Sequence, residues 1–295
     1  MLHKLDNLIK GTVVKRPSRH IRTPYVADVL INDDEVLAHS PALGCCGLAD
    51  VSANVLLAVS PEPKTKTKPK NQANLKCSHT IYLALVKESK IINNSVTECE
   101  QIVGIHPKLA ETLVESALTN NLLTKLQNII RFRRETVIKI QDKIDSRFDF
   151  TGVDCNNIPF IMEVKNVPLA DYEDITAKER VKLTFDDREV DSKVAYFPDG
   201  YRKSTADTVS PRALKHMEEL TYIKKETNIR CIMCYVIQRT DVNRFQPSVI
   251  DPQYRSAFKN AIDAGVEIIT MVVSWNRNGE ATFIRDDLPL SMDGL

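Results

Sequence analysis

Charged residues inside an apolar strand constrain this 295-residue chain most strongly. In the segment PFIMEVKNV, residues 159–167, Glu163 and Lys165 stand among mostly apolar neighbours. Charged side chains are costly to bury unless they are paired or bound to a metal ion. Residues two apart on a strand point to the same face. The pattern therefore predicts that Glu163 and Lys165 project together while Val164 points into the core.

A second acid lies in the strand that we predict just before this one. Asp149, in RFDFTGV, precedes Glu163 by fourteen positions, and a hairpin that turns near DCNN brings the two side by side. Two carboxylates and the backbone carbonyl of Val164 form an oxygen ligand set suited to Mg²⁺ or Mn²⁺. The pattern predicts a metal-dependent phosphodiesterase site, with Asp149 and Glu163 on the metal. Lys165 completes the catalytic set by stabilising the charge that develops on a phosphate.

Composition and charge exclude several classes of protein. The net charge is +1, so the chain as a whole is not a polybasic binder, and its 43% apolar residues suffice for packed cores. We find no run of about eighteen apolar residues that predicts a membrane span, and no apolar region of a secretory signal. Seven scattered cysteines are read as reduced thiols. We therefore expect an intracellular protein of the cytoplasm or nucleus, with no membrane partner.

Although the net charge is close to zero, positively charged residues cluster in two short segments. One segment, PKTKTKPKNQANLK, contains five lysines and no acid, namely Lys64, Lys66, Lys68, Lys70 and Lys76. A second segment, RFRR, adds Arg131, Arg133 and Arg134. Lysine and arginine provide most of the affinity for nucleic acid by neutralising phosphates. These residues are candidates for nucleic-acid binding, although a lysine run is also typical of a solvated loop.

The pattern of elements predicts two domains. Residues 1–105 contain about five short β-branched or apolar runs separated by turn-forming residues, which favours a small β-barrel of the OB-like kind. Residues 106–295 predict an α/β domain with a mixed sheet. There, apolar spacing over 107–134 predicts two helices, the second ending in the basic RFRR segment. A charged insertion is expected at 170–195.

Several motifs resemble the sugar fermentation stimulation protein A (SfsA) family. In chain order they are YVADVLI, HSPALG, SRFDF, IMEVKNVPL, YFPDG, LKHMEEL and NRFQPSVIDPQYRSAFKNAIDAGVEIITM. The resemblance implies an N-terminal OB-like barrel, a C-terminal nuclease-like domain of the PD-(D/E)xK type, and DNA binding. By position, Asp149, Glu163 and Lys165 fall on the family's acid and Glu-x-Lys residues. His216 falls on its Lys-His-Leu segment, and Glu135 is a candidate for a further acid.

Two departures bear on the substrate rather than on the catalytic residues. The family's His-x-Pro-Asn-Thr-Gly turn is His-Ser-Pro-Ala-Leu-Gly here, so Ala42 and Leu43 replace two polar side chains. The insertion at 170–195 is unusually long.

Three functions stay open. The first is a metal-dependent nuclease that hydrolyses DNA, or RNA, with little sequence preference, because stacking aromatic residues are only 6% of the chain. The second is a non-catalytic, non-specific DNA-binding protein that acts as a regulator. The third is a scaffolding protein whose acids merely pair on a sheet face. The sequence leaves open whether the chain forms a homodimer.

Overall fold

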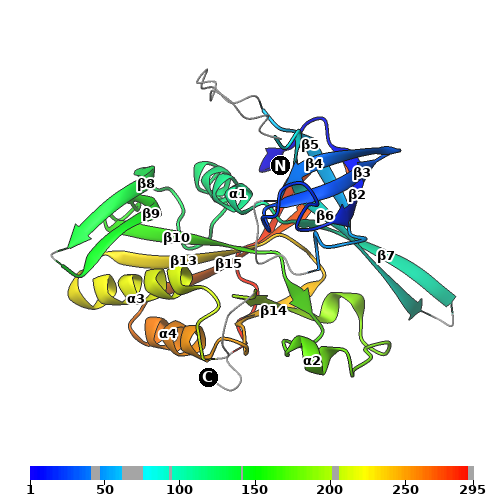
Figure 1. Ribbon diagram of the computed structural model, residues 1–295. Coiled ribbons are helices and arrows are strands. Elements are labelled where there is room, and N and C mark those ends of the chain that lie inside the picture. The colour runs from blue at the N-terminus through cyan, green and yellow to red at the C-terminus, as the bar shows by residue number, and fades with distance from the viewer. Residues whose placement is uncertain (41–46, 62–75, 93–94, 141, 201–205, 292–295) are drawn as a thin grey trace.

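The computed structural model describes residues 1–40, 47–61, 76–92, 95–140, 142–200 and 206–291. In these ranges the strands form three sheets, and the longer helices lie on the two faces of the largest sheet (Figure 1). No helix in the described ranges is long and apolar enough to cross a membrane.

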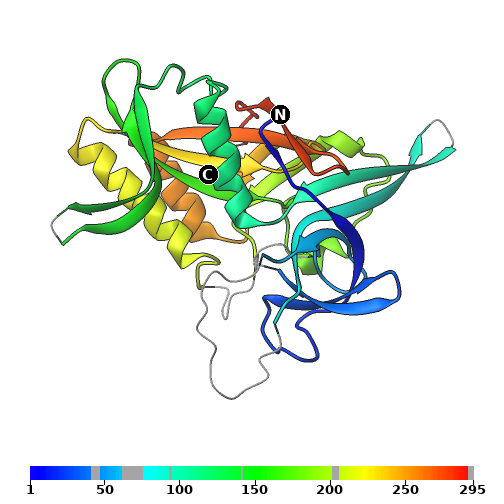
Figure 2. The same ribbon diagram turned by 90° about the horizontal axis from the view of Figure 1, so that it is seen from above.

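The first sheet curls into a barrel. Its strand order is β4-β3-β2-β5-β6-β7, and a parallel pairing between β4 and β6 closes the ring of the first five strands. The strands are β2 (Ile9–Lys15), β3 (Val26–Ile31), β4 (Asp34–His39), β5 (Asn54–Val59), β6 (His79–Ile92) and β7 (Ser95–Gly104). The five predicted strands are confirmed. The sequence did not predict β7, because it pairs along a hairpin that extends away from the barrel and lacks a continuous apolar face (Figure 2).

The second sheet is mixed, as predicted. Its order is β1-β16-β15-β13-β10-β9-β8, with β10, β13 and β15 parallel and the other neighbours antiparallel. The strands are β1 (His3–Lys4), β8 (Arg131–Ile140), β9 (Ile144–Val153), β10 (Pro159–Val167), β13 (Arg230–Ile237), β15 (Glu267–Trp275) and β16 (Glu280–Arg285). Because β1 pairs with β16, the start of the chain lies on this sheet and not in the barrel. The domain boundary at residue 105 stays a prediction.

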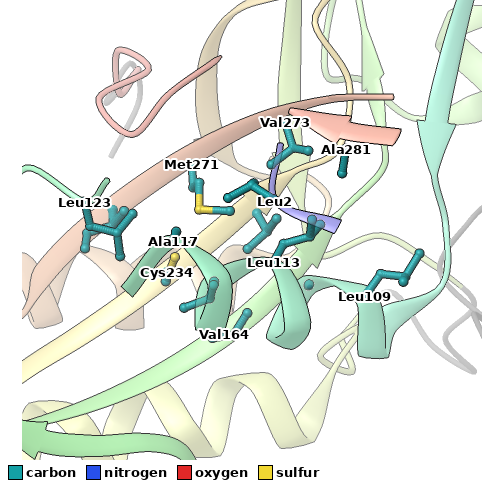
Figure 3. Packing of buried hydrophobic residues seen from close by; sticks show 14 of the residues in the cluster. Leu2, Leu109, Leu113, Ala117, Leu123, Val164, Cys234, Met271, Val273 and Ala281 are labelled. Atoms are coloured by element: carbon teal, nitrogen blue, oxygen red, sulfur yellow. The ribbon is translucent and has the colours of Figure 1, made fainter. Parts of the chain in front are cut away.

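Helix α1 (Pro107–Thr119) covers one face of this sheet. Figure 3 shows Leu113 and Ala117 of α1 among buried side chains from the sheet, including Val164 and Met271. Val164 therefore points into the core beneath α1, as the two-residue period of a strand predicted.

The other face is covered by α3 (Pro211–Glu226) and α4 (Pro252–Asp263). Both begin with a proline in the first turn; Ser210 and Asp251 are the N-caps, and each side chain accepts a backbone N–H. Met217 and Ile223 of α3 pack on this face in one apolar cluster with Ile161 and Tyr235. Glu163 and Lys165 leave β10 on the same side as Ile161, toward α3.

The predicted second helix within 107–134 is wrong. Turns occupy residues 120–130, and Asn121 and Asn128 have positive φ angles of 54° and 53°, which interrupt a helix. Leu123 and Leu126 still pack into the core under α1, so the apolar spacing reflected burial and not helix. The RFRR segment belongs to strand β8.

The insertion at 170–195 folds beside the barrel hairpin. A small third sheet has the order β11-β12-β14, formed by β11 (Ala170–Asp171), β12 (Lys193–Phe197) and β14 (Val242–Pro247). Between β11 and β12 lie α2 (Ala177–Arg180) and the 3₁₀ turn η1 (Val190–Ser192). The side chain of Lys193 bridges this insertion to Glu88 of β6, with 2.8 Å between Nζ and Oε2.

Candidate active site

Strands β9 and β10 separate at Asp149. Their antiparallel register ends with Met162 opposite Phe150. One residue further, the Asp149 carboxylate accepts a hydrogen bond from the backbone N–H of Val164, with 2.7 Å between Oδ2 and N. The side chain replaces a strand partner, so the sheet opens while the backbone group stays satisfied. Because the N–H and C=O of one strand residue point to the same side, the Val164 carbonyl faces this opening too.

Glu163 is buried, with 2% of its surface exposed, and is held through one oxygen. Its Oε1 lies 2.6 Å from Nζ of Lys165 and also hydrogen-bonds with Nδ1 of His216. Lys165 Nζ and His216 Nδ1 are 3.3 Å apart. Within the described residues, Oε2 of Glu163 is buried and has no hydrogen-bond partner. Leaving such an atom unpaired costs about 1–3 kcal/mol, so a hydrogen-bond donor or a cation that reached this oxygen would be stabilised.

The two carboxyl groups have pKa values shifted in opposite directions. Burial, followed by repulsion from Glu163, raises the pKa of Asp149 to about 7. Burial also opposes ionisation of Glu163, but Lys165 and His216 outweigh it and hold the pKa of Glu163 below its ordinary value. At neutral pH the pair thus lacks enough positive charge to ionise fully.

These groups line a cavity of about 820 Å³ between the barrel and the large sheet. Asp149, Glu163 and Lys165 line it from the sheet. Arg16 and Asp50 line it from the barrel, with 3.8 Å between Arg16 Nη1 and Asp50 Oδ1. The catalytic triplet predicted from sequence therefore gathers at one concave site, where active sites are most often found.

Among the described acids of the cavity, the sequence analysis missed Asp50, Glu111 and Asp199. Glu111 of α1 lines the cavity, and its charge contributes to the raised pKa of Asp149. Arg134 holds Glu111 and Glu115 at 2.8 Å each. Like charges four apart on a helix repel each other, so this acidic pair next to the apolar face of α1 was the available signal.

The structure does not bring Glu135 to the cavity. Glu135 was expected at the end of a basic helix, but it lies within strand β8 with a φ angle of 50°. Its side chain is 55% exposed and pairs with Arg147 at 3.4 Å. His216, by contrast, is brought into the site by α3, which crosses beneath β10.

The predicted basic residues are distributed over several elements. Arg131 and Arg133 are exposed on β8, whereas Arg134 is engaged by the two glutamates of α1. Lys76 is exposed before β6. Lys64, Lys66, Lys68 and Lys70 lie outside the described residues, as do Ala42 and Leu43 of the departing turn.

The side chains of the described residues do not by themselves form a recognisable metal site. In the part of the chain that the structure describes, no three His, Cys, Asp or Glu side chains are grouped as a metal site. Asp149, Glu163 and Val164, the residues of the predicted set, all line the cavity where β9 and β10 separate, and their role as metal ligands stays a prediction. The unpaired oxygen of Glu163 and the incomplete charge balance both fit a cation there.

Comparison with known proteins identifies the family. The family model described as the sugar fermentation stimulation protein RE domain matches residues 181–279, which follow Asp149, Glu163 and Lys165 in the chain. A sugar fermentation stimulation protein homolog from Jannaschia sp. is 30% identical over 265 residues, covering 89% of this chain and 86% of that protein. A homolog from Clostridium kluyveri is 26% identical over 293 residues, covering 99% and 100%. The chain belongs to the SfsA family, as its motifs predicted.

A solved structure shares the fold. The structure of Pyrococcus furiosus SfsA in complex with Ca²⁺ matches with a TM-score of 0.68 and covers 98% of each chain at 18% sequence identity. The likeness extends over both the curled sheet and the mixed sheet with its helices.

Proposed function

We propose that this protein is a metal-dependent nuclease that hydrolyses phosphodiester bonds of DNA, or RNA, with little sequence preference. The observation that supports it best is the buried, unpaired Oε2 of Glu163 beside Asp149. A hard cation with oxygen ligands would satisfy that atom and allow both acids to ionise.

Asp149, Glu163 and the Val164 carbonyl would hold the cation. When bound, it would lower the pKa of a water and neutralise charge on the scissile phosphate. Oxygen donors favour Mg²⁺ or Mn²⁺, and the Ca²⁺ in the Pyrococcus furiosus protein supports a divalent site. Lys165 lines the cavity with a side chain that is 12% exposed, so its charge is available to a phosphate there.

His216 is a positioning residue in this proposal. It is buried on α3 and bonds the same Glu163 oxygen that Lys165 contacts. Because both Lys165 and His216 hydrogen-bond Oε1 of Glu163, the carboxylate is fixed in orientation, and its Oε2 remains for the cation. Partners that orient a ligating carboxylate commonly affect metal affinity about 10–100-fold.

The named fold types are part of the proposal. Closure of five strands with β4 and β6 parallel supports an OB-like barrel. An acid on β9, a Glu-x-Lys on β10, and flanking helices α1 and α3 support the PD-(D/E)xK type. We propose residues 1–105 and 106–295 as the two domains, apart from β1, which pairs with β16.

The alternative is a DNA-binding protein without catalysis. Arg131, Arg133 and Lys76 are exposed and none of them lines the cavity, so they could contact a phosphate backbone without serving the acids. Contacts of this kind position a strand and give no sequence information directly.

Cleavage assays separate the two functions. Labelled single- and double-stranded DNA and RNA would be incubated with Mg²⁺ or Mn²⁺ and the wild type, Glu163→Gln or Lys165→Met. Nuclease activity predicts a loss of about 10²–10³-fold in both variants. Glu98→Gln is the control, because this glutamate is exposed on β7 and pairs with Lys87. Intact substrates with wild type, combined with salt-dependent binding of DNA, would reject the enzyme and favour the binding protein.

A further inference from the structure

The walls of the cavity differ in chemistry from its acidic floor. In the part of the chain that the structure describes, five prolines line it, from the barrel, from the start of α1 and from the ends of β10 and β12: Pro17, Pro24, Pro107, Pro168 and Pro198. Tyr196 and Phe197, both partly exposed, line it as well. Apolar and aromatic walls suit the faces of nucleobases, which stack on such side chains once they leave a helix.

The proposed reacting groups are part of the cavity lining. Glu163 is 2% exposed and the Lys165 side chain 12% exposed, so a scissile phosphate must enter the cavity to reach them. Its volume of about 820 Å³ falls in the range of about 300–1,000 Å³ that holds a small ligand. A B-form duplex, whose major groove alone is about 12 Å wide, does not enter such a space.

The charges of the lining also limit how many phosphates can enter. Among the described residues, five acids line the cavity: Asp50, Glu111, Asp149, Glu163 and Asp199. The basic side chains of the same described lining are those of Arg16, Lys165 and Arg212. This excess of acids would repel a polyanion, so the cavity suits one cation-bound phosphate and its immediate neighbours, not a long backbone track.

Arg212 is placed to take a neighbouring phosphate. It lies four residues before His216 on α3, hence on the same helix face and one turn nearer the helix start. It is exposed and lines the cavity. Arg16 lies on the barrel side, where its Nε donates to the Pro24 carbonyl at 2.8 Å and fixes its position.

We propose that the cavity accepts one unstacked nucleotide of a single strand, with its base between the proline and aromatic walls and Arg212 on an adjacent phosphate. This inference rests on the proposed function for its cleavage step only. Single-stranded nucleic acid is therefore the preferred substrate class.

Binding tests the inference independently of cleavage. Fluorescence anisotropy would compare one labelled oligonucleotide, alone and as a blunt duplex, on Glu163→Gln and on wild type with Ca²⁺, at one salt concentration. We expect the single strand to bind at least ten-fold more tightly. Arg212→Ala should weaken single-strand binding about ten-fold and leave duplex binding unchanged. Arg285→Ala, which removes an exposed arginine paired with Asp287, should change neither.

Each outcome separates the inference from the proposed function. Equal or tighter binding of the duplex overturns the inference, whether or not either substrate is cut. Loss of both single-strand and duplex binding in Arg212→Ala also overturns it, because Arg212 would then belong to a general surface. Preference for the single strand with no cleavage in Mg²⁺ or Mn²⁺ keeps the inference and rejects the nuclease.

Discussion

Two buried clusters of charge differ in how completely they are paired. In the Lys193 network, formed by Glu88, Lys193, Arg239 and Asp241, Lys193 Nζ lies 2.8 Å from an oxygen of each acid. Arg239 Nε donates a hydrogen bond to the other Asp241 oxygen, Oδ1, with 2.7 Å between the two atoms. Burial opposes ionisation of Asp241, yet Arg239 and Lys193 hold its pKa below the ordinary value.

In the Glu163 cluster, formed by Asp149, Glu163, Lys165 and His216, pairing is incomplete. One oxygen of Glu163 has no partner within the described residues, and the pKa of Asp149 is raised to about 7. Both clusters are buried between packed elements, so burial alone does not distinguish them. A balanced cluster ties elements together, whereas an unbalanced one is a candidate site for a ligand.

We expect the largest effect from a substitution in the Lys193 network, where it should lower the stability of the protein. Asp241→Ala leaves Lys193 and Arg239 buried with too little negative charge, which should lower the free energy of unfolding by about 3–5 kcal/mol. Urea unfolding followed by circular dichroism measures this, and Ca²⁺ should not restore the loss. The control Asp287→Ala removes an exposed pair with Arg285 and should stay within about 0.5 kcal/mol. An Asp241→Ala protein as stable as the wild type would show that the network contributes nothing.

In the Glu163 cluster, replacing the buried acid should reduce cleavage activity and leave the stability of the protein nearly unchanged. Glu163→Gln should reduce cleavage about 10²–10³-fold. Its melting temperature in EDTA should change little, because Asp149 can then ionise and balance Lys165. Calorimetric titration with Ca²⁺ should show weaker binding than in wild type. A large loss of stability in EDTA would mean that Glu163 is a structural partner like Asp241.

Asp149 should give metal-free protein a distinctive pH dependence. Its pKa is about 7 in the folded protein against an ordinary 3.8, so the folded state binds the extra proton between these values. The stability linked to Asp149 is complete below about pH 4 and is lost as the pH rises through about 7. Asp149→Asn, whose amide oxygen can still accept the Val164 N–H, should remove this decline. Unfolding in EDTA from pH 4 to 8 measures it; parallel curves for the two proteins would contradict the assignment.

The smallest expected effect is on Ca²⁺ binding. It distinguishes Glu111 from Glu135, two glutamates that lie outside the triplet of Asp149, Glu163 and Lys165. Glu111→Gln should weaken Ca²⁺ binding about ten-fold, because Glu111 adds negative charge beside Asp149. Glu135→Gln should leave it unchanged, because Glu135 is exposed and paired with Arg147. The reverse result would make Glu135 the additional acid, the role that the sequence analysis proposed for it.

Much of the fold was predictable because local patterns and tertiary burial agree. The barrel strands, the meander of β8, β9 and β10, and helices α3 and α4 follow from alternation, apolar runs and caps. The prediction failed at residues 122–130, where apolar spacing like that of a helix occurs in turns that pack under α1. It also missed β7, which pairs with β6 along a hairpin that extends beyond the barrel, although Val103 near its end packs in the barrel core.

The sequence by itself determined the triplet. Asp149, Glu163 and Lys165 lie on neighbouring strands with Val164 facing inward, because side chains alternate along a strand and a hairpin joins the two. Only the tertiary structure placed Glu111 and His216, from helices that cover opposite faces of the sheet, and left one oxygen of Glu163 unpaired. Contacts between elements far apart in the chain depend on packing and on the separation of β9 from β10. No local pattern in the sequence records either.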